Sequence, residues 1–118
     1  KVVGYNGEVI YDGAVTLLGE GPTVADALYA LETNGSITSL DMTNNAIQSI
    51  NGTQTQPDST GEYYFYWRYS LNGHTEDETV TVSGDESSLY LGITLQPIVA
   101  GDSIVIEYVY IAISDLED

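Results

Sequence analysis

Two stretches of the chain alternate their side chains in the manner of long β-strands. The first, residues 63–71, reads YYFYWRYSL and ends at the turn pair Asn72-Gly73. Successive side chains of a strand face opposite ways, so Tyr63, Phe65, Trp67 and Tyr69 share one face. We expect this face to lie in the core. The other face carries Tyr64, Tyr66 and Arg68. These residues either cover the sheet as good strand formers or offer stacked rings and one cation to a ligand or partner.

The second stretch, Ser103–Ser114, is apolar or aromatic on both of its faces. Its candidate assembly residues are Ile104, Ile106, Tyr108, Tyr110, Ile111 and Ile113. A strand with two apolar faces in a small domain is either central in its own sheet or paired with a strand from another subunit. Both interpretations stay open from the pattern alone.

One segment has the 3.6-residue period of an amphipathic helix. Thr23 is a good N-cap, and Asp26 stands three residues later as in a capping box. The apolar positions that follow are Val24, Ala27, Leu28 and Leu31. Asn34-Gly35 supplies residues that tolerate the left-handed conformation at the end of a helix. The spacing predicts a helix over 23–32.

The remaining pattern consists of short strands and turns. Asn6-Gly7 and Asp12-Gly13 are both hairpin signals. We favour the second, which pairs Glu8–Tyr11 with Ala14–Leu18 and leaves residues 1–6 as an extended arm or a bulged start. Further extended segments are expected at Ile37–Met42, Ala46–Ile50, Thr79–Ser83 and Leu89–Ile98, with turns at Asn51-Gly52, Gly84–Ser88 and Ala100–Asp102.

This order of elements predicts one α+β domain over residues 1–118, with one short helix on a mixed sheet in a β-grasp arrangement. The long terminal strand covers 103–114. An immunoglobulin-like β-sandwich is the alternative, and the helix argues against it.

Composition adds a strong acidic charge. The 118 residues include 18 acidic side chains against Lys1 and Arg68, a formal net charge of −16. Such a field repels nucleic acid and anionic membrane, so neither is expected as a partner. No apolar run of about 18 residues is present for direct membrane insertion.

An acidic loop provides the candidate metal ligands. Oxygen-rich sites suit calcium, and the loop carries Glu76, Asp77 and Glu78, with Asp85 a short strand away. The spacing matches no EF-hand. A solvated acidic run is the alternative interpretation.

Polar composition indicates an extracellular or cell-surface setting. Lysine is nearly absent, while hydroxyl and amide side chains are abundant. Asn34 and Asn51 each begin a glycosylation sequon. The chain begins at Lys1 without Met or a signal-peptide pattern, so we expect a mature or excised segment whose targeting sequence lies elsewhere. Cysteine is absent, so no disulfide framework is expected.

No catalytic constellation is visible. His74 is the single histidine and no cysteine accompanies it, which excludes a zinc site or a nucleophilic triad. No pair of carboxylates stands out for acid–base work, so the chain is expected not to be an enzyme.

Several short motifs occur in the order found in a known family. They are GPTVADAL at 21–28, IQSING at 47–52, YWRYSLNG at 66–73, and Gly92-Ile93 with AGDSI at 100–104. Together with an opening hairpin, they resemble the transcobalamin-type C-terminal β-grasp module, a domain of unknown function that recurs in prokaryotic surface proteins. The resemblance covers about 90 residues. Each motif alone is weak, and the resemblance is specific because all of them occur in the same order and at similar spacing.

The resemblance implies a β-grasp fold and, in animal relatives, half of a cobalamin site whose other half comes from a helical domain. This chain departs from the pattern by an acidic insertion between Leu71 and Leu89 and by a strand prolonged past Tyr108. No helical domain is present in it.

Two functional hypotheses follow. The first is a non-enzymatic extracellular surface module with a structural or adhesive role, whose partner is itself, as a homo-oligomer or filament formed by strand pairing, or other surface proteins. The alternative is a module that binds cobalamin, a related corrinoid or another small ligand.

Overall fold

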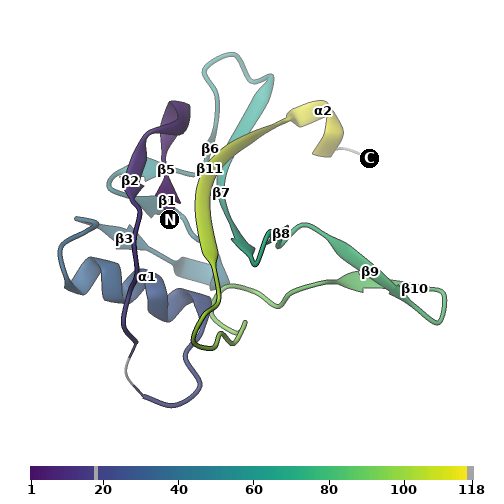
Figure 1. The fold of residues 1–118 in the computed structure, drawn as a ribbon. Helices are drawn as coiled ribbons and strands as arrows, with labels where there is room; N and C mark the ends of the chain where they lie inside the picture. The colour runs from purple at the N-terminus through teal and green to yellow at the C-terminus, as the bar shows by residue number, and fades with distance from the viewer. Residues whose placement is uncertain (18, 117–118) are drawn as a thin grey trace.

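The computed structural model describes residues 1–17 and 19–116, and its centre is one long antiparallel strand pair (Figure 1). Strand β7 (Tyr63–Leu71) pairs with β11 (Ile104–Ala112) along all nine residues, from Ile104 opposite Leu71 to Ala112 opposite Tyr63. Both strands are rich in aromatic and β-branched residues, which suit a pleated surface.

Shorter strands extend this pair into a mixed sheet of order β2-β1-β11-β7-β6. Strand β1 (Val2–Val3) runs parallel to β11, and β2 (Val9–Tyr11) runs antiparallel to β1. On the other side, β6 (Gln56–Pro57) and β8 (His74–Thr75) pair with the two ends of β7. A mixed sheet with the ten-residue helix α1 (Val24–Thr33) makes the fold α+β, as predicted.

The opening hairpin differs from the prediction. The chain turns at η1 (Tyr5–Gly7), where Asn6 and Gly7 have φ angles of 58° and 77°. The hairpin therefore uses Asn6-Gly7, and the favoured pairing across Asp12-Gly13 is wrong. Residues 14–17 form no strand, and Leu18 lies outside the described residues. Residues 1–6 are not a free arm, because Val2 is buried between β11 and β2.

Helix α1 (Val24–Thr33) confirms the capping pattern. The Thr23 N–H donates to Asp26 Oδ2 at 2.8 Å and the Thr23 hydroxyl donates to the same atom at 3.2 Å. At the other end Asn34 is the C-cap and Gly35 has a φ of 84°.

A small second sheet lies beside the helix. It contains β3 (Leu40–Asp41), β4 (Ser49–Ile50) and β5 (Thr53–Gln54), with η2 (Thr43–Asn45) after β3. The turn between β4 and β5 is at Asn51-Gly52, as predicted, with φ angles of 52° and 83°.

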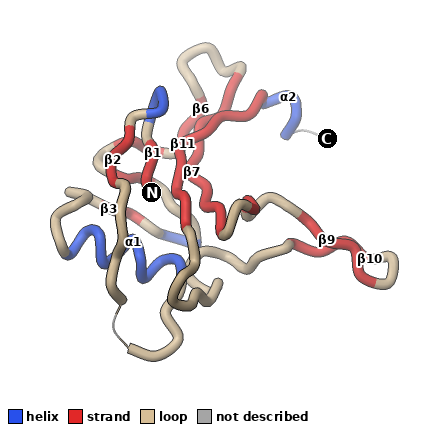
Figure 2. Tube along the Cα trace, in the orientation of Figure 1, coloured by secondary structure: helices blue, strands red, loops and turns tan. Residues whose placement is uncertain are grey.

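The core fills the space between the central sheet, the helix and the small sheet. Leu28, Ile50 and Tyr69 are fully buried there, and Trp67 is 4% exposed. Of the four residues on the predicted core face of β7, Trp67 and Tyr69 lie in the core as predicted, whereas Tyr63 is exposed and Phe65 is only half-buried, because both lie beyond the end of the core. Figure 2 shows the helix on one side of the β7–β11 pair.

A second hairpin extends away from this body (Figure 1). It consists of β9 (Thr79–Val82) and β10 (Asp85–Ser88), which pair only with each other. We call it the hairpin arm. The predicted strand at 79–83 is confirmed. The predicted turn at 84–88 is wrong, because these residues contain β10. The turn is confined to Ser83-Gly84, whose φ angles are 54° and 86°.

Two further expectations need correction. Residues 89–98 form no continuous strand: they contain a turn at 93–95, where the N–H groups of Leu95 and Gln96 both donate to the Gly92 carbonyl. The last strand ends at Ala112 and continues into the short helix α2 (Ile113–Leu116), so strand geometry does not reach Ser114.

Candidate functional site

The face of the β7–β11 pair opposite the helix carries the predicted stacking residues. We call it the open face; its side chains are half-buried, except for Ser70, which is buried. It consists of Tyr64, Tyr66, Arg68, Ser70, Val105, Glu107, Val109 and Ile111. The rings of Tyr64 and Tyr66 stack with centroids 6.4 Å apart and an interplanar angle of 22°. The division of β7 into two faces was therefore predicted correctly.

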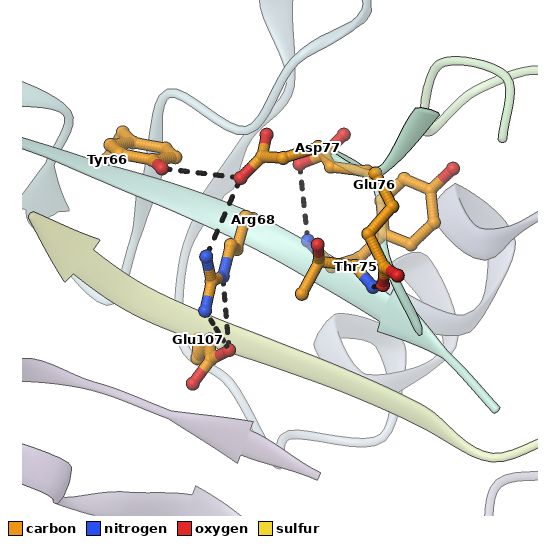
Figure 3. A network of polar contacts seen from close by, with 8 residues as sticks. Tyr66, Arg68, Thr75, Glu76, Asp77 and Glu107 are labelled. Atoms are coloured by element: carbon orange, nitrogen blue, oxygen red, sulfur yellow. Dashed lines mark hydrogen bonds and ion pairs between the residues drawn. The ribbon is translucent and has the colours of Figure 1, made fainter. Parts of the chain in front are cut away.

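Arg68 is held by acidic neighbours on the open face (Figure 3). Its Nε and Nη2 donate to Glu107 Oε1 at 3.1 and 3.0 Å, and Nη1 lies 3.5 Å from Asp77 Oδ2. Burial acts to lower the pKa of Arg68, but Glu107 and Asp77 outweigh it and raise that pKa. The guanidinium is thus committed to internal ion pairs across the strands.

Tyr66 and Asp77 complete this network. The Tyr66 hydroxyl donates to Asp77 Oδ2 at 3.4 Å. Burial, and then the charge of Asp77, raise the pKa of Tyr66. A hollow of about 560 Å³ opens beside these two residues, with Tyr64, Trp67 and Ile47 also in its wall. Tyr64 and Tyr66 therefore remain available to a small ligand, whereas Arg68 serves mainly to hold the strands.

Among the described residues, Glu76 is the carboxyl group whose pKa is raised most. Its N–H donates to the Tyr69 carbonyl at 3.0 Å, and its Oε1 accepts the Tyr69 N–H at 3.2 Å. Burial raises the pKa of Glu76 to about 7, and the nearby charge of Asp77 adds to the effect, although the hydrogen bond from Tyr69 opposes it. The pKa of Glu76 therefore lies near neutral pH, well above that of an ordinary glutamate.

The candidate calcium ligands turn toward different partners. Asp77 contacts Arg68, while Glu78 accepts the Thr75 N–H at 2.6 Å and lies 3.3 Å from His74 Nδ1. Asp85 belongs to the hairpin arm. Within residues 1–17 and 19–116, no three His, Asp or Glu side chains form a group that could hold a metal ion.

Both sequon asparagines are exposed, and their side-chain oxygens are used locally. Asn34 Oδ1 accepts the Ser36 N–H at 2.9 Å, and Asn51 Oδ1 accepts the Thr38 N–H at 2.7 Å. Asn51 thereby joins the small sheet to the segment after the helix.

Strand β11 has one complete edge and one partly free edge. The β7 edge is paired throughout. On the other edge β1 reaches only Ile106 and Glu107, and the Ile106 N–H donates to the Lys1 carbonyl at 2.8 Å. Backbone groups alternate along a strand, so those of Tyr108, Tyr110 and Ala112 point the same way as Ile106. Among the described residues no strand pairs with them there, and we call this stretch the free edge.

The assembly residues named from sequence separate by location. Ile104 and Ile106 face the core, with Ile106 3% exposed. Tyr108 and Tyr110 lie along the free edge, Ile111 is on the open face, and Ile113 begins α2. Alternation places Ile111 on the face opposite Ile104, Ile106, Tyr108 and Tyr110. The pattern could not show which of these four lie along the free edge, because that depends on where β1 stops, and it did not predict the change from strand to helix at Ile113.

An aromatic groove on the helix-side face was missed from sequence. It lies beyond the end of the core, and its five rings are Tyr5, Tyr63, Phe65, Tyr108 and Tyr110. The shared face of Tyr63 and Phe65 was visible in the alternation. The register that sets Tyr110 opposite Phe65, and the turn that brings Tyr5 over them, are tertiary features.

A scan against protein-family models and searches of curated proteins and of solved structures found no match to this chain. The resemblance to the transcobalamin-type module therefore stays a prediction. No helix in the described part of the chain has the length and apolar character needed to cross a membrane.

Proposed function

We propose that the protein is a non-enzymatic extracellular surface module with a structural or adhesive role, and that it self-associates by strand pairing. The observation that carries this proposal is the free edge of β11, where no strand in the described part of the chain pairs with the backbone groups of Tyr108, Tyr110 and Ala112. A row of unpaired N–H and C=O groups is a template for a strand from another chain.

The hairpin arm supplies a candidate partner for that edge. In the sheet order the free edge is the edge of β11 on which the short strand β1 also lies. The hairpin arm follows β8, which pairs with the opposite edge of β7. Figure 1 shows the arm leaving the body on the side away from β1 and β2. Contacts between unlike surfaces on opposite sides of a molecule join copies head to tail and build open filaments.

The arm itself has the properties of a docking element. Its described side chains are exposed, and a two-stranded hairpin is only marginally stable in water on its own. Pairing of β10 with a neighbour's β11 would give the arm a third strand and cover the free edge at the same time.

Light scattering and electron microscopy of three variants test this assembly. Residues 79–88 can be replaced by Asn-Gly, because the Leu89 N–H already donates to the Glu78 carbonyl at 2.9 Å. Tyr110→Lys places a charge on the free edge, which disfavours edge pairing. Val99→Lys, at a side chain 72% exposed, makes the same charge change elsewhere.

We expect the wild type and Val99→Lys to form oligomers or filaments in concentrated solution at about 0.15 M salt or above, where charge repulsion is screened. The arm replacement and Tyr110→Lys should remain monomeric. A wild type that is monomeric at all concentrations, or an unchanged assembly in both variants, would overturn the proposal.

A second candidate function is binding of a small planar ligand, including a corrinoid, beside Tyr64 and Tyr66. The hollow of about 560 Å³ there has the size of an ordinary small-molecule site. Trp67 lines the same hollow, so its fluorescence reports on occupancy. Titration with cobalamin to about millimolar concentration should quench it if this function is correct; an unchanged signal would remove this candidate.

A further inference from the structure

The aromatic groove has the geometry of a cage rather than of a flat platform. Tyr5 stands edge-on to Phe65 and Tyr108, at interplanar angles of 65° and 63°. Tyr63 and Tyr110 are nearly perpendicular, at 85°, with ring centroids 5.4 Å apart. The five rings thus present surfaces in several directions around one hollow of about 440 Å³.

Three of the five rings of the groove, those of Tyr5, Tyr63 and Tyr110, are exposed to solvent. Tyr5 is 56% exposed and Tyr110 is 66% exposed, and Tyr63 is also exposed. Phe65 and Tyr108 form the floor, stacked at 5.5 Å with an angle of 12°. The turn residues Asn6 and Gly7 close one side, so the hollow suits a small rounded group.

The charges around the groove favour a bound group that is positively charged. No Lys or Arg lines the hollow; Arg68 is bound to Glu107 and Asp77 on the opposite face. Asp58 lines the adjoining hollow. Its carboxylate accepts hydrogen bonds from the Thr60 hydroxyl at 2.8 Å and from the Tyr63 N–H at 3.2 Å. A net charge of −16 further raises the local concentration of cations.

We propose that this aromatic groove binds a small quaternary or alkylated ammonium compound. Aromatic faces carry negative potential, and cages of such rings attract ammonium groups by cation–π interaction. A neutral sugar or a planar ring system would instead favour coplanar rings, which are found here only in the floor pair. This site lies on the other face of the sheet from Tyr64 and Tyr66.

The test compares choline with its neutral isostere, 3,3-dimethylbutan-1-ol, by NMR titration of the wild-type protein. Both molecules have the same bulky end, so only the charge differs. We expect shifts of the amide signals of Gly7 and Tyr110 with choline, at an affinity at least about tenfold above that of the isostere. Sodium chloride at equal ionic strength serves as the salt control.

Two variants and a matched control locate the site. Tyr5→Leu and Tyr110→Leu should each weaken choline binding several-fold, whereas Tyr29→Leu, at an exposed tyrosine on α1, should leave it unchanged. Equal binding of the isostere, stronger binding of a neutral oligosaccharide, or choline binding that survives both groove variants would overturn the proposal. The choline-to-isostere comparison uses the wild type, so it decides the question even where a variant fails to fold.

Discussion

At the scale of single residues, the sheet is organised around charges placed between strands. Arg68 joins β7 to β11 through Glu107 and to the loop after β8 through Asp77. The Glu76 carboxyl group accepts the Tyr69 N–H of β7, which in a regular sheet would be bonded to a backbone carbonyl of the neighbouring strand. Two charged side chains therefore complete a sheet whose strands are otherwise aromatic and aliphatic.

The raised pKa of Glu76 makes stability depend on pH. The folded-state pKa of about 7 lies above the ordinary 4.5, so the folded protein holds more protons between these values. Stability contributed by this group falls as the pH rises from about 4.5 to 7. Glu76→Gln keeps the acceptor and removes the titration. The variant should exceed the wild type in free energy of unfolding by about 1–2 kcal/mol at pH 8, after allowance for solvent screening.

Denaturant unfolding of both proteins from pH 4 to 8 measures this difference. It should vanish near pH 4, where the carboxyl group is protonated in both states. A constant difference across the range would show that the proton of Glu76 is not involved.

The ion pairs of Arg68 should contribute more to the free energy of unfolding than ion pairs on the exposed surface do. Arg68→Leu leaves Glu107 half-buried without its cation, and we expect a loss of about 1–2 kcal/mol. The double variant Arg68→Leu/Glu107→Leu removes both charges and should recover most of that loss. Thermal melts of the three proteins provide the measurement. Equal losses in the single and double variants would contradict this account.

At the scale of elements, the helix and the two long strands follow from local pattern. The capping residues Thr23 and Asp26 and the alternation of β7 were sufficient to predict α1 and the buried face with Trp67. These features depend on neighbours within a few residues of one another.

The misplaced hairpin shows where local pattern fails. Asn6-Gly7 and Asp12-Gly13 are equal as turn signals, and the choice depends on β1 pairing with β11, about a hundred residues away. The free edge, the aromatic groove and the Arg68–Glu107 pair depend on the same long-range register. They could be recognised only once the register of β11 against β1 and β7 was known.

Helix α1 offers a test of its capping and dipole. Asp26→Ala removes the acceptor of the Thr23 N–H and should cost about 0.5–2 kcal/mol. Glu32→Ala removes an acidic group near the C-terminal end, where the dipole disfavours it, and should be neutral or slightly stabilising. The melting temperature should thus fall for Asp26→Ala and stay unchanged or rise slightly for Glu32→Ala. Similar losses in both would mean that capping does not determine the stability of α1.

At the scale of the whole molecule, charge and shape act together. A net charge of −16 opposes both compaction and association, so salt should favour both. We expect the melting temperature to rise by several degrees between about 0.02 and 0.5 M sodium chloride. A melting temperature that stays flat or falls over this range would contradict the role given to charge repulsion.

Calcium chloride at matched ionic strength separates screening from binding. An equal rise assigns the effect to screening. A further rise with calcium would support ligation by the acidic side chains after β8.

The central claim is that the free edge of β11 pairs with a strand of a neighbouring copy. Hydrogen exchange of the backbone N–H groups of Tyr108, Tyr110 and Ala112, followed over a range of protein concentrations, tests it most directly. The Ile106 N–H, bonded to the Lys1 carbonyl, is the internal reference and should be protected throughout. We predict that the three edge amides exchange fast in dilute solution and become protected as concentration rises. Exchange that is independent of concentration would contradict the claim.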